Sequence, residues 1–352
     1  MAPAQCRPSV SVESVNRLAP NTVSVETVPE FQLQAACLGC SGSLVRCMES
    51  LYDTRFGIPG SYEVWSCSQC GLEQLYPVPT AAQLKVWYEA HYNFGGSGEN
   101  LYTQIRRRFL SSIFYRWWMA VDGDISFHTR KGSGRLLDVG CNEGRGLKLY
   151  AGNGFQVEGL ELNERAAAAA RRQGFTVHTQ LLEKFHPAEP YDVVVLSNVL
   201  EHSTDPQQML REVRRVLKPG GQVFISCPNA RSWLRTVFGS SWINWHVPFH
   251  IVQFSPASLM KALHEAGFGA IEIKQITPAL WVASSFIVGM FARQGKATKQ
   301  LRNPALVSML LLSVRCFLFP LLYFGNSLGR GDCLLAVAML PRVQKDYPAG
   351  AD

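Results

Sequence analysis

Residues 136–146 read Leu136-Leu137-Asp138-Val139-Gly140-Cys141-Asn142-Glu143-Gly144-Arg145-Gly146, and they are the strongest indicator of the fold. An apolar run that ends in glycines predicts a buried strand, a tight turn and the start of a helix. A second strand is predicted at Val157 to Leu160 and is followed by Glu161. A carboxylate about 20 residues beyond such a turn suits the ribose hydroxyls of a nucleoside at the carboxyl edge of a parallel sheet. The expected ligand is a nucleoside or a nucleoside conjugate.

The composition of the turn narrows the ligand further. A dinucleotide fold needs a bare helix N-terminus for a pyrophosphate, whereas Glu143 here places a carboxylate that would repel one. Asp138 instead suits a cationic ligand such as the methionine end of S-adenosylmethionine (SAM). The segment resembles the first motif of the class I SAM-dependent methyltransferases, roughly D-x-G-x-G-x-G. Asn142 replaces the middle glycine, and because asparagine tolerates positive φ well, the turn is expected to persist.

The resemblance extends downstream. The sequence predicts a helix at Ala166 to Arg172, a strand buried on both faces at Tyr191 to Leu196, the segment Ser197 to His202, a helix at Pro206 to Leu217, a turn at Lys218 to Gly221 and a strand at Gln222 to Ser226. This order is similar to the ubiquinone-type and sugar-type small-molecule methyltransferases and covers residues 136–273, with a last strand at 334–340. The expected fold is α/β, a Rossmann-like seven-stranded sheet whose core spans 135–278 and 331–345.

The resemblance implies roles for the residues at the glycine turn and beyond it. The methionine end of SAM would be held by Asp138, Gly140, Cys141, Asn142 and Gly144, and the ribose by Glu161. Leu162 and Leu181 would flank the adenine, although the acid that many relatives place near Leu181 is absent. Ser197 and Asn198 would line the face from which the methyl group leaves.

Three histidines, His202, His246 and His250, are candidate general bases for an oxygen or nitrogen acceptor, and His202 and His250 are the two favoured. His202 follows the predicted strand at 191–196, and His250 lies in the segment Trp245 to His250 before a helix predicted at Ala257 to Ala266. A positioned histidine can take the proton that methyl transfer releases. Each histidine also has a purely structural interpretation, His202 as a residue bonded in the first turn after the strand and His250 as a cap or packing residue of a lid.

Two C-x-x-C pairs precede the core. Cys37 and Cys40 are separated by 26 residues from Cys67 and Cys70. Four thiolates at this spacing predict a tetrahedral structural zinc site in a zinc-ribbon module at residues 31–80, with iron or unmetallated thiols as alternatives. A closed four-cysteine site has no open coordination position, so it is expected to fold the module rather than perform chemistry.

The segments around the ribbon are less specific. Residues 1–30 are polar and predicted to be disordered, and they show no secretory signal, which favours a reduced, cytoplasmic protein. Residues 81–134 are predicted to be a helical linker that covers the core. Within it, Ile105 to Ala120 combines arginines with aromatic residues and predicts either an interfacial anchor or a helix that covers the sheet.

A basic, apolar insertion is predicted at 279–330. From Ile273 to Gly331 there is no acid and there are seven basic residues, which equals the whole net charge of +7 (34 minus 27). Its first apolar run, Ala279 to Ala292, is too short to span a bilayer, and the second, Ala305 to Gly325, is expected to be cut by Arg315 and Pro320. The pattern favours an interfacial hairpin on an anionic membrane surface, peripheral on its inner face, and leaves open a protein-buried insertion, a homodimer interface or a spanning helix.

These observations predict a SAM-dependent methyltransferase, an O-methyltransferase for a sugar hydroxyl in lipid-linked saccharide or surface polysaccharide biosynthesis. The alternatives are methylation of a prenylated quinone-like ring, methylation of RNA, or a non-catalytic SAM-binding scaffold. Nucleic acid is not favoured as a partner because the positive charge lies among apolar helices rather than in a polar groove with aromatic residues.

Overall fold

The computed structural model describes residues 36–91, 108, 112–113, 119 and 122–342. The disorder predicted for residues 1–30 lies outside the described residues, and so does most of the basic, aromatic segment predicted at Ile105 to Ala120.

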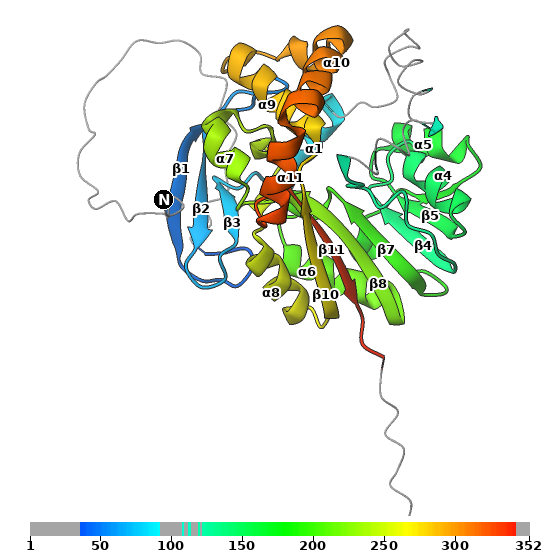
Figure 1. Ribbon diagram of the computed structural model, residues 1–352. Coiled ribbons are helices and arrows are strands. Elements are labelled where there is room, and N and C mark those ends of the chain that lie inside the picture. The colour runs from blue at the N-terminus through cyan, green and yellow to red at the C-terminus, as the bar shows by residue number, and fades with distance from the viewer. Residues whose placement is uncertain (1–35, 92–107, 109–111, 114–118, 120–121, 343–352) are drawn as a thin grey trace, which may run out of the picture.

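A seven-stranded sheet forms the core, in the order β10-β11-β8-β7-β4-β5-β6 (Figure 1). Its strands are β4 (Arg135–Val139), β5 (Gln156–Leu160), β6 (Thr176–His178), β7 (Tyr191–Ser197), β8 (Leu217–Pro228), β10 (Gly269–Ile276) and β11 (Cys333–Met339). β4 to β8 run parallel, and β11 is antiparallel to both β8 and β10. The predicted fold class is confirmed. Because the chain runs outward from β4 to β6 and then returns to β7, the topology switches between β4 and β7, where such sheets bind ligands.

Helices cover both faces of this sheet, which explains the unbroken apolar strands. One face packs on α6 (Pro206–Val216) and α8 (Pro256–Glu265), and it presents Leu137, Val194 and Ile225. The other face presents Leu136, Val195 and Phe224 to a second cluster that includes Tyr150 of α4 (Arg145–Gly152). α5 (Glu164–Arg171) and the 3₁₀ turn η1 (Leu182–Lys184) follow β5 and β6. Successive residues of one strand therefore serve two cores.

The Lys218 to Gly221 segment is not a turn that precedes a strand. It belongs to β8, which already pairs with β7 at Leu217. The pairing jumps from Tyr191–Leu217 to Val193–Gln222, so the extra residues bulge out of the ladder, with Gly220 at φ 84°. Glycine accepts this left-handed conformation at little cost, which lets the strand continue through the bulge.

The cysteine module is a sheet that the core completes. β1 (Leu44–Leu51), β2 (Tyr62–Cys67) and β3 (Glu73–Tyr76) are antiparallel, and β3 pairs with β9 (Val252–Gln253). Cys67 and Leu72 belong to the same apolar cluster as the α6 and α8 face of the large sheet. The module predicted at 31–80 is thus packed onto the core, and α1 (Ala81–His91) follows it.

The segment between β8 and β9 consists of short helices and turns. These are α7 (Trp233–Phe238), η3 (Gly239–Ser241) and η4 (Ile243–Trp245), and η2 (Leu200–His202) follows β7. α9 (Ala279–Phe291) packs on this segment, because Ile243, Val288 and Ala292 share one buried cluster.

The second apolar run of the insertion is not cut. After η5 (Lys299–Arg302), the chain is helical throughout Pro304–Ser327, as α10 (Pro304–Ser313), a π-helical turn η6 (Val314–Leu318) and α11 (Phe319–Ser327). A π turn widens the helix locally, so Pro320 can follow it without ending the helix. By length and composition this 24-residue helix could cross a membrane, with a mean hydropathy of 2.2, and only 11% of its most apolar window is buried. Figure 1 shows α9 and α10 at one end of the molecule, with α11 running from there back toward β10 and β11.

Arg315 does not interrupt the exposed apolar face. Its guanidinium pairs with the carboxylate of Asp122, and the two side chains are only 10% and 9% exposed. Asp122 also accepts a hydrogen bond from the Ala279 backbone N–H at the start of α9, at 2.9 Å. The outward face of the helix bears large apolar side chains that are 56–80% exposed, namely Met309, Leu312, Phe317, Tyr323 and Phe324.

Candidate active site

The glycine turn adopts the left-handed backbone that its composition requires. Gly140, Asn142 and Gly144 have φ values of 74°, 49° and 79°. The prediction that Asn142 keeps the turn is confirmed, and its side-chain amide donates to the Gly140 carbonyl at 3.2 Å. A Cβ on Gly144 would lie 2.8 Å from the Cβ of Ala170, so a glycine there lets α4 and α5 pack closely.

Glu161 joins the turn to the end of β5. One carboxylate oxygen accepts from the Asn142 N–H at 2.9 Å, and the other accepts from the Asn163 N–H at 2.8 Å. Burial raises the pKa of Glu161, while these backbone donors act in the opposite direction. Each oxygen has a further lone pair, so the carboxylate keeps capacity for a diol.

Asp138 lies in β4 beneath the turn and is 6% exposed. Burial, with the negative charge of Glu161 as a second cause, raises its pKa to about 8. A cationic ligand group would offset both causes, because an opposite charge favours the ionised carboxylate. The pair of carboxylates therefore fits a ligand that presents an ammonium group and a ribose diol.

The remaining predicted cofactor residues lie around the same sheet edge. Leu162, directly after Glu161, is 61% exposed, and Leu181, which follows β6, is 46% exposed, so two large apolar side chains offer surfaces to an aromatic ring. Ser197 ends β7 and donates to Ser126 Oγ at 3.1 Å, and Asn198 follows it at φ 53°. Cys141 is buried against Gly159 and Leu147, so it contributes backbone rather than its thiol.

The two candidate bases meet, although they come from segments that are far apart in the chain. The ring centroids of His202 and His250 are 4.8 Å apart, and His246 adds a third ring 4.9 Å from that of His250. The Nδ1 atom of His202 lies 2.9 Å from the Phe249 carbonyl oxygen. Burial lowers the pKa of His202 to about 4 and that of His250 well below its usual range, so both rings are neutral.

Sequence reasoning did not assign a role to Glu201, which lies between these rings. Its side chain is 1% exposed, and burial raises its pKa to about 8. Neither carboxylate oxygen has a hydrogen-bond partner among the described residues, and the nearest imidazole nitrogen, Nε2 of His250, is 4.0 Å away. A lone glutamate at a helix start is ordinarily exposed, so no signal in the sequence distinguished it. Tyr88 of α1, whose hydroxyl lies 2.9 Å from His202 Nδ1, also carried no signal.

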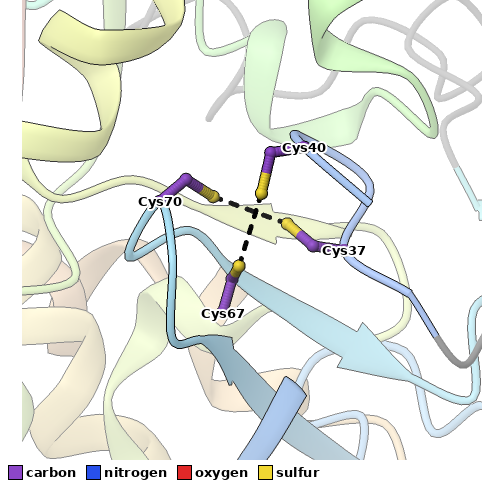
Figure 2. Close-up of side chains that lie close together, drawn as sticks. All are labelled: Cys37, Cys40, Cys67 and Cys70. Carbon is purple, nitrogen blue, oxygen red and sulfur yellow. Dashed lines mark hydrogen bonds between the residues drawn. The ribbon is translucent and has the colours of Figure 1, made fainter. Parts of the chain in front are cut away.

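The four cysteines of the ribbon converge from two loops (Figure 2). The Sγ atoms of Cys37 and Cys70 are 3.5 Å apart, as are those of Cys40 and Cys67. Tetrahedral zinc with Zn–S bonds of about 2.3 Å requires S···S separations of about 3.8 Å, close to those found. Backbone N–H groups of Gly39 and Gln69 point at Cys37 Sγ and Cys67 Sγ at 3.3 and 3.4 Å, as they do when the acceptor is a thiolate. The donor set fits a zinc ion.

Comparison with known proteins identifies relatives of the core. A family model described as a methyltransferase domain matches residues 115–273. The chain is 34% identical to the ubiquinone biosynthesis O-methyltransferase of Thiobacillus denitrificans over 158 residues, which are 41% of this chain and 68% of that protein. It is 31% identical to the protein of the same name from Burkholderia vietnamiensis, over 47% of this chain and 84% of that protein.

Other relatives of that name, from Sodalis glossinidius and Klebsiella pneumoniae, are covered over about half of their length (49% and 51%). Among solved structures, a SAM-dependent methyltransferase from Thermotoga maritima, described as a possible histamine N-methyltransferase, aligns with a TM-score of 0.41 at 18% identity. That alignment covers 67% of this chain and 99% of the other.

Proposed function

The chain belongs to the class I SAM-dependent methyltransferases, and from this premise we propose that it methylates a hydroxyl group of a lipid-linked acceptor at an anionic membrane surface. The methyltransferase activity follows from the family. The acceptor and the location are our proposal, and the observation on which they rest is the apolar insertion between β10 and β11.

The glycine turn and the ends of β4, β5 and β7 would hold the cofactor. SAM supplies an electrophilic methyl group on a sulfonium, so the protein mainly has to position the reactants. Asp138 would face the ammonium group, Glu161 the ribose diol, and Leu162 and Leu181 the adenine. Ser197 and Asn198 lie at the end of β7, between this site and the histidines that follow.

An acceptor hydroxyl must lose a proton during the transfer. Burial lowers the pKa values of His202 and His250, so both rings are neutral at physiological pH and each keeps a lone pair for a proton. The same shift makes each ring a weaker base than a free imidazole, so their contribution as bases would come from position rather than from basicity. His202 lies a few residues beyond Ser197 in the chain, and the ring of His250 lies 4.8 Å from that of His202, between centroids. Because these histidines lie beside α1 and the short helices η2 and η4, we propose that an oxygen acceptor approaches from that side.

The insertion is connected to this acceptor side. The Ile243 N–H donates to Ser285 Oγ of α9 at 3.0 Å, and the next residue, Asn244, accepts from His250 Nδ1 at 2.8 Å. An apolar insertion that packs on the segment holding a candidate base supports an acceptor with an apolar portion.

Membrane association is supported by the exposed face of α10 and α11 and by the charge beside it. Arg293, Lys296, Lys299 and Arg302 are all exposed in the connection between α9 and α10. Basic residues near an anionic surface contribute about 1 kcal/mol each, in addition to apolar burial. We propose that this helix lies in the membrane interface, peripheral on the inner face; the competing homodimer interface is an outcome of the tests below.

Two acceptor classes share the required chemistry, a prenylated phenol and a lipid-linked sugar. The names of the relatives, ubiquinone biosynthesis O-methyltransferases, support the phenol. Nothing in the relatives supports the sugar that the sequence first suggested, and the two classes are therefore separated by experiment.

We also propose that a structural zinc ion is bound by the four cysteines of the ribbon, Cys37, Cys40, Cys67 and Cys70. A thiolate site of this kind has no open coordination position, so its ion stabilises the fold and performs no chemistry.

The experiment incubates purified protein with SAM carrying a trideuterated methyl group and a membrane lipid extract, followed by mass spectrometry of the lipid and polar fractions. Label in a prenylated phenol or in a saccharide released from lipid supports the proposal and names the acceptor class. The control is Glu161→Gln, which should lose the label, beside His264→Ala on the exposed face of α8, which should keep it. No label in the lipid extract, with label in a parallel incubation with total RNA or with the water-soluble extract, would overturn the lipid-linked acceptor.

A further inference from the structure

A second group of potential metal ligands lies apart from the cysteine site. Glu201, His202 and His250 each offer one ligand atom, and these atoms all lie within 4.8 Å of one another. Glu201 and His202 belong to η2, and His250 comes from the loop before β9, so the cluster joins two segments that are distant in sequence. Among the described residues this is the one such group besides the four cysteines.

Hydrogen bonds fix the state of both imidazole rings. His202 Nδ1 lies 2.9 Å from the Phe249 carbonyl oxygen, and His250 Nδ1 lies 2.8 Å from the Asn244 carbonyl oxygen. A carbonyl oxygen can only accept, so these contacts favour a hydrogen on Nδ1 of each ring, which leaves the lone pair on Nε2. The Tyr88 hydroxyl, also 2.9 Å from His202 Nδ1, then acts as a second acceptor for the same hydrogen. Histidines that ligate metals typically have this arrangement, in which the far N–H is held by a backbone carbonyl.

Glu201 is the unexplained member of the cluster. It is 1% exposed, and neither of its carboxylate oxygens has a hydrogen-bond partner among the described residues. A buried carboxylate without hydrogen bonds is costly unless it is neutralised, paired with a cation or bound to a metal. Its nearest imidazole nitrogen, His250 Nε2, is at 4.0 Å, which is too long for a hydrogen bond.

That distance is compatible with a shared ion. Ligand atoms at about 2.1 Å from a tetrahedral ion are about 3.4 Å apart. The Glu201–His250 pair would therefore have to close from 4.0 Å by a fraction of an ångström, and a pair at the 4.8 Å limit of the cluster by about 1.4 Å, which side-chain rotation would have to supply. Two imidazoles and one carboxylate are borderline ligands that favour zinc, iron(II) and related divalent ions over magnesium or calcium.

We propose that Glu201, His202 and His250 bind a divalent transition-metal ion such as Zn²⁺. Three protein ligands leave a coordination position open, as in catalytic rather than structural sites. The open position would take an oxygen of the acceptor, and this part rests on the proposed O-methyl transfer. In the metal-bound protein the ion would use the Nε2 lone pairs, so the two histidines would be ligands instead of the bases considered above. The ion would then lower the pKa of the bound acceptor hydroxyl, whose proton would pass to solvent.

One neighbouring charge limits the affinity. Burial is the main cause that lowers the pKa of both histidines, and the positive charge of Arg55, from the loop between β1 and β2, lowers it further. The same charge opposes a bound cation. Glu201 is the charge that compensates, so replacing it should abolish binding. The four-cysteine site of the ribbon provides four thiolates and is expected to bind far more tightly, which makes the two sites separable.

The test uses the full-length protein, stripped with a chelator and titrated with Co²⁺. Thiolate-to-cobalt charge-transfer absorption reports the four-cysteine site alone, and elemental analysis after gel filtration reports the total. We expect two ions per wild-type chain, of which only the first develops charge-transfer absorption. Glu201→Gln, which keeps the size of the side chain, should bind one ion with the charge-transfer band intact, while the exposed control Glu265→Gln should bind two.

X-ray absorption of the wild-type protein keeps the test independent of the folding of variants. With two ions bound, the mean number of sulfur ligands per ion should fall from about four to about two, with nitrogen and oxygen ligands making up the rest. One ion per chain at saturating metal, or two ions with sulfur ligands only, would overturn the site. Because neither readout uses activity, a second ion without methyl transfer to a hydroxyl would retain the metal site and reject the acceptor.

Discussion

Asp332, where the insertion returns to the sheet just before β11, anchors the segment of short helices at 232–244, on the proposed acceptor side. It is 1% exposed and accepts hydrogen bonds from Ser232 Oγ at 2.6 Å, Trp242 Nε1 at 2.8 Å and Asn244 Nδ2 at 3.1 Å. Asp332→Ala would leave three buried donors without their acceptor. Each such group costs about 1–3 kcal/mol, and because water can enter the vacated space, we expect a total loss of about 3–5 kcal/mol in the free energy of unfolding.

Urea denaturation followed by tryptophan fluorescence measures this loss. Trp242→Phe removes one donor and keeps an aromatic ring, so it should cost about 1 kcal/mol. The double variant should lose less free energy of unfolding than the sum of the losses of the two single variants, because the Trp242 donor that Asp332→Ala would leave unpaired is already absent. A loss below about 1 kcal/mol for Asp332→Ala, or strict additivity with Trp242→Phe, would refute the reasoning that these bonds hold the segment.

The same carboxyl predicts a pH dependence. Burial raises the pKa of Asp332 to about 6, above its unfolded value, so its contribution is greatest when it is protonated and is lost as pH rises through 6. The stability of wild type relative to Asp332→Asn, which cannot ionise, should therefore fall by about 1 kcal/mol between pH 5 and pH 7.5. Taking the difference between the two proteins removes the effect of other titrating groups. If this difference in the free energy of unfolding rises with pH instead, the hydrogen bonds from the three donors stabilise the ionised carboxylate by more than burial destabilises it.

Three further perturbations test the cofactor site, the ribbon and the insertion. Glu161→Ala should weaken SAM binding in calorimetry by one to two orders of magnitude, the roughly 1.5–3 kcal/mol of a charged hydrogen-bonding group, and unchanged affinity would remove Glu161 from the ribose. Removing zinc from the four cysteines with a chelator should lower the melting temperature, and zinc addition should restore it; a metal-free protein that melts as before would exclude a structural ion. In liposome flotation, wild type should stay on anionic lipid at low salt and dissociate as salt rises, and glutamine at positions 293, 296, 299 and 302 should release it. A protein that never floats, with residues 279–325 protected in a dimer, would make the insertion an oligomer interface.

The half of the core that forms the SAM site was predictable because the sequence patterns that determine it are local. A strand buried on both faces needs an apolar run, and a left-handed turn needs glycine or asparagine, so Gly140, Asn142 and Gly144 could be placed from the sequence alone. The position of Glu161 beside the turn could be predicted from its spacing along the chain. The bulge at Gly220 shows what a local pattern leaves out. A glycine pair predicts a turn, but it does not tell whether the β7–β8 hydrogen-bond ladder continues on both sides of that turn, as it does here.

The acceptor half was not predictable because its determinants are contacts across the chain. β9 is only two residues long and becomes a strand because β3 pairs with it. Glu201 has the sequence context of an exposed helix start, and only packing buries it. Pro320 and Arg315 were expected to break the apolar run, yet a π turn accommodates the proline and Asp122, far along the chain, neutralises the arginine.

The ribbon and the insertion, although separate in sequence, hold the same segment of the core. Arg55 of the ribbon donates to the Ile243 carbonyl at 3.3 Å, and Ser285 of the insertion accepts from the Ile243 N–H at 3.0 Å. A second ribbon contact, between Glu73 and Arg235 at 2.7 Å, fixes α7 just upstream. Since Asn244 then positions His250 through its carbonyl, both additions act on the proposed acceptor side. Among the described residues, these three contacts reach residues 235–243 of the core rather than the glycine turn. Variation in these two elements should therefore change which acceptor is methylated while leaving SAM affinity unaltered, the division of labour expected when specificity is added to a shared catalytic fold.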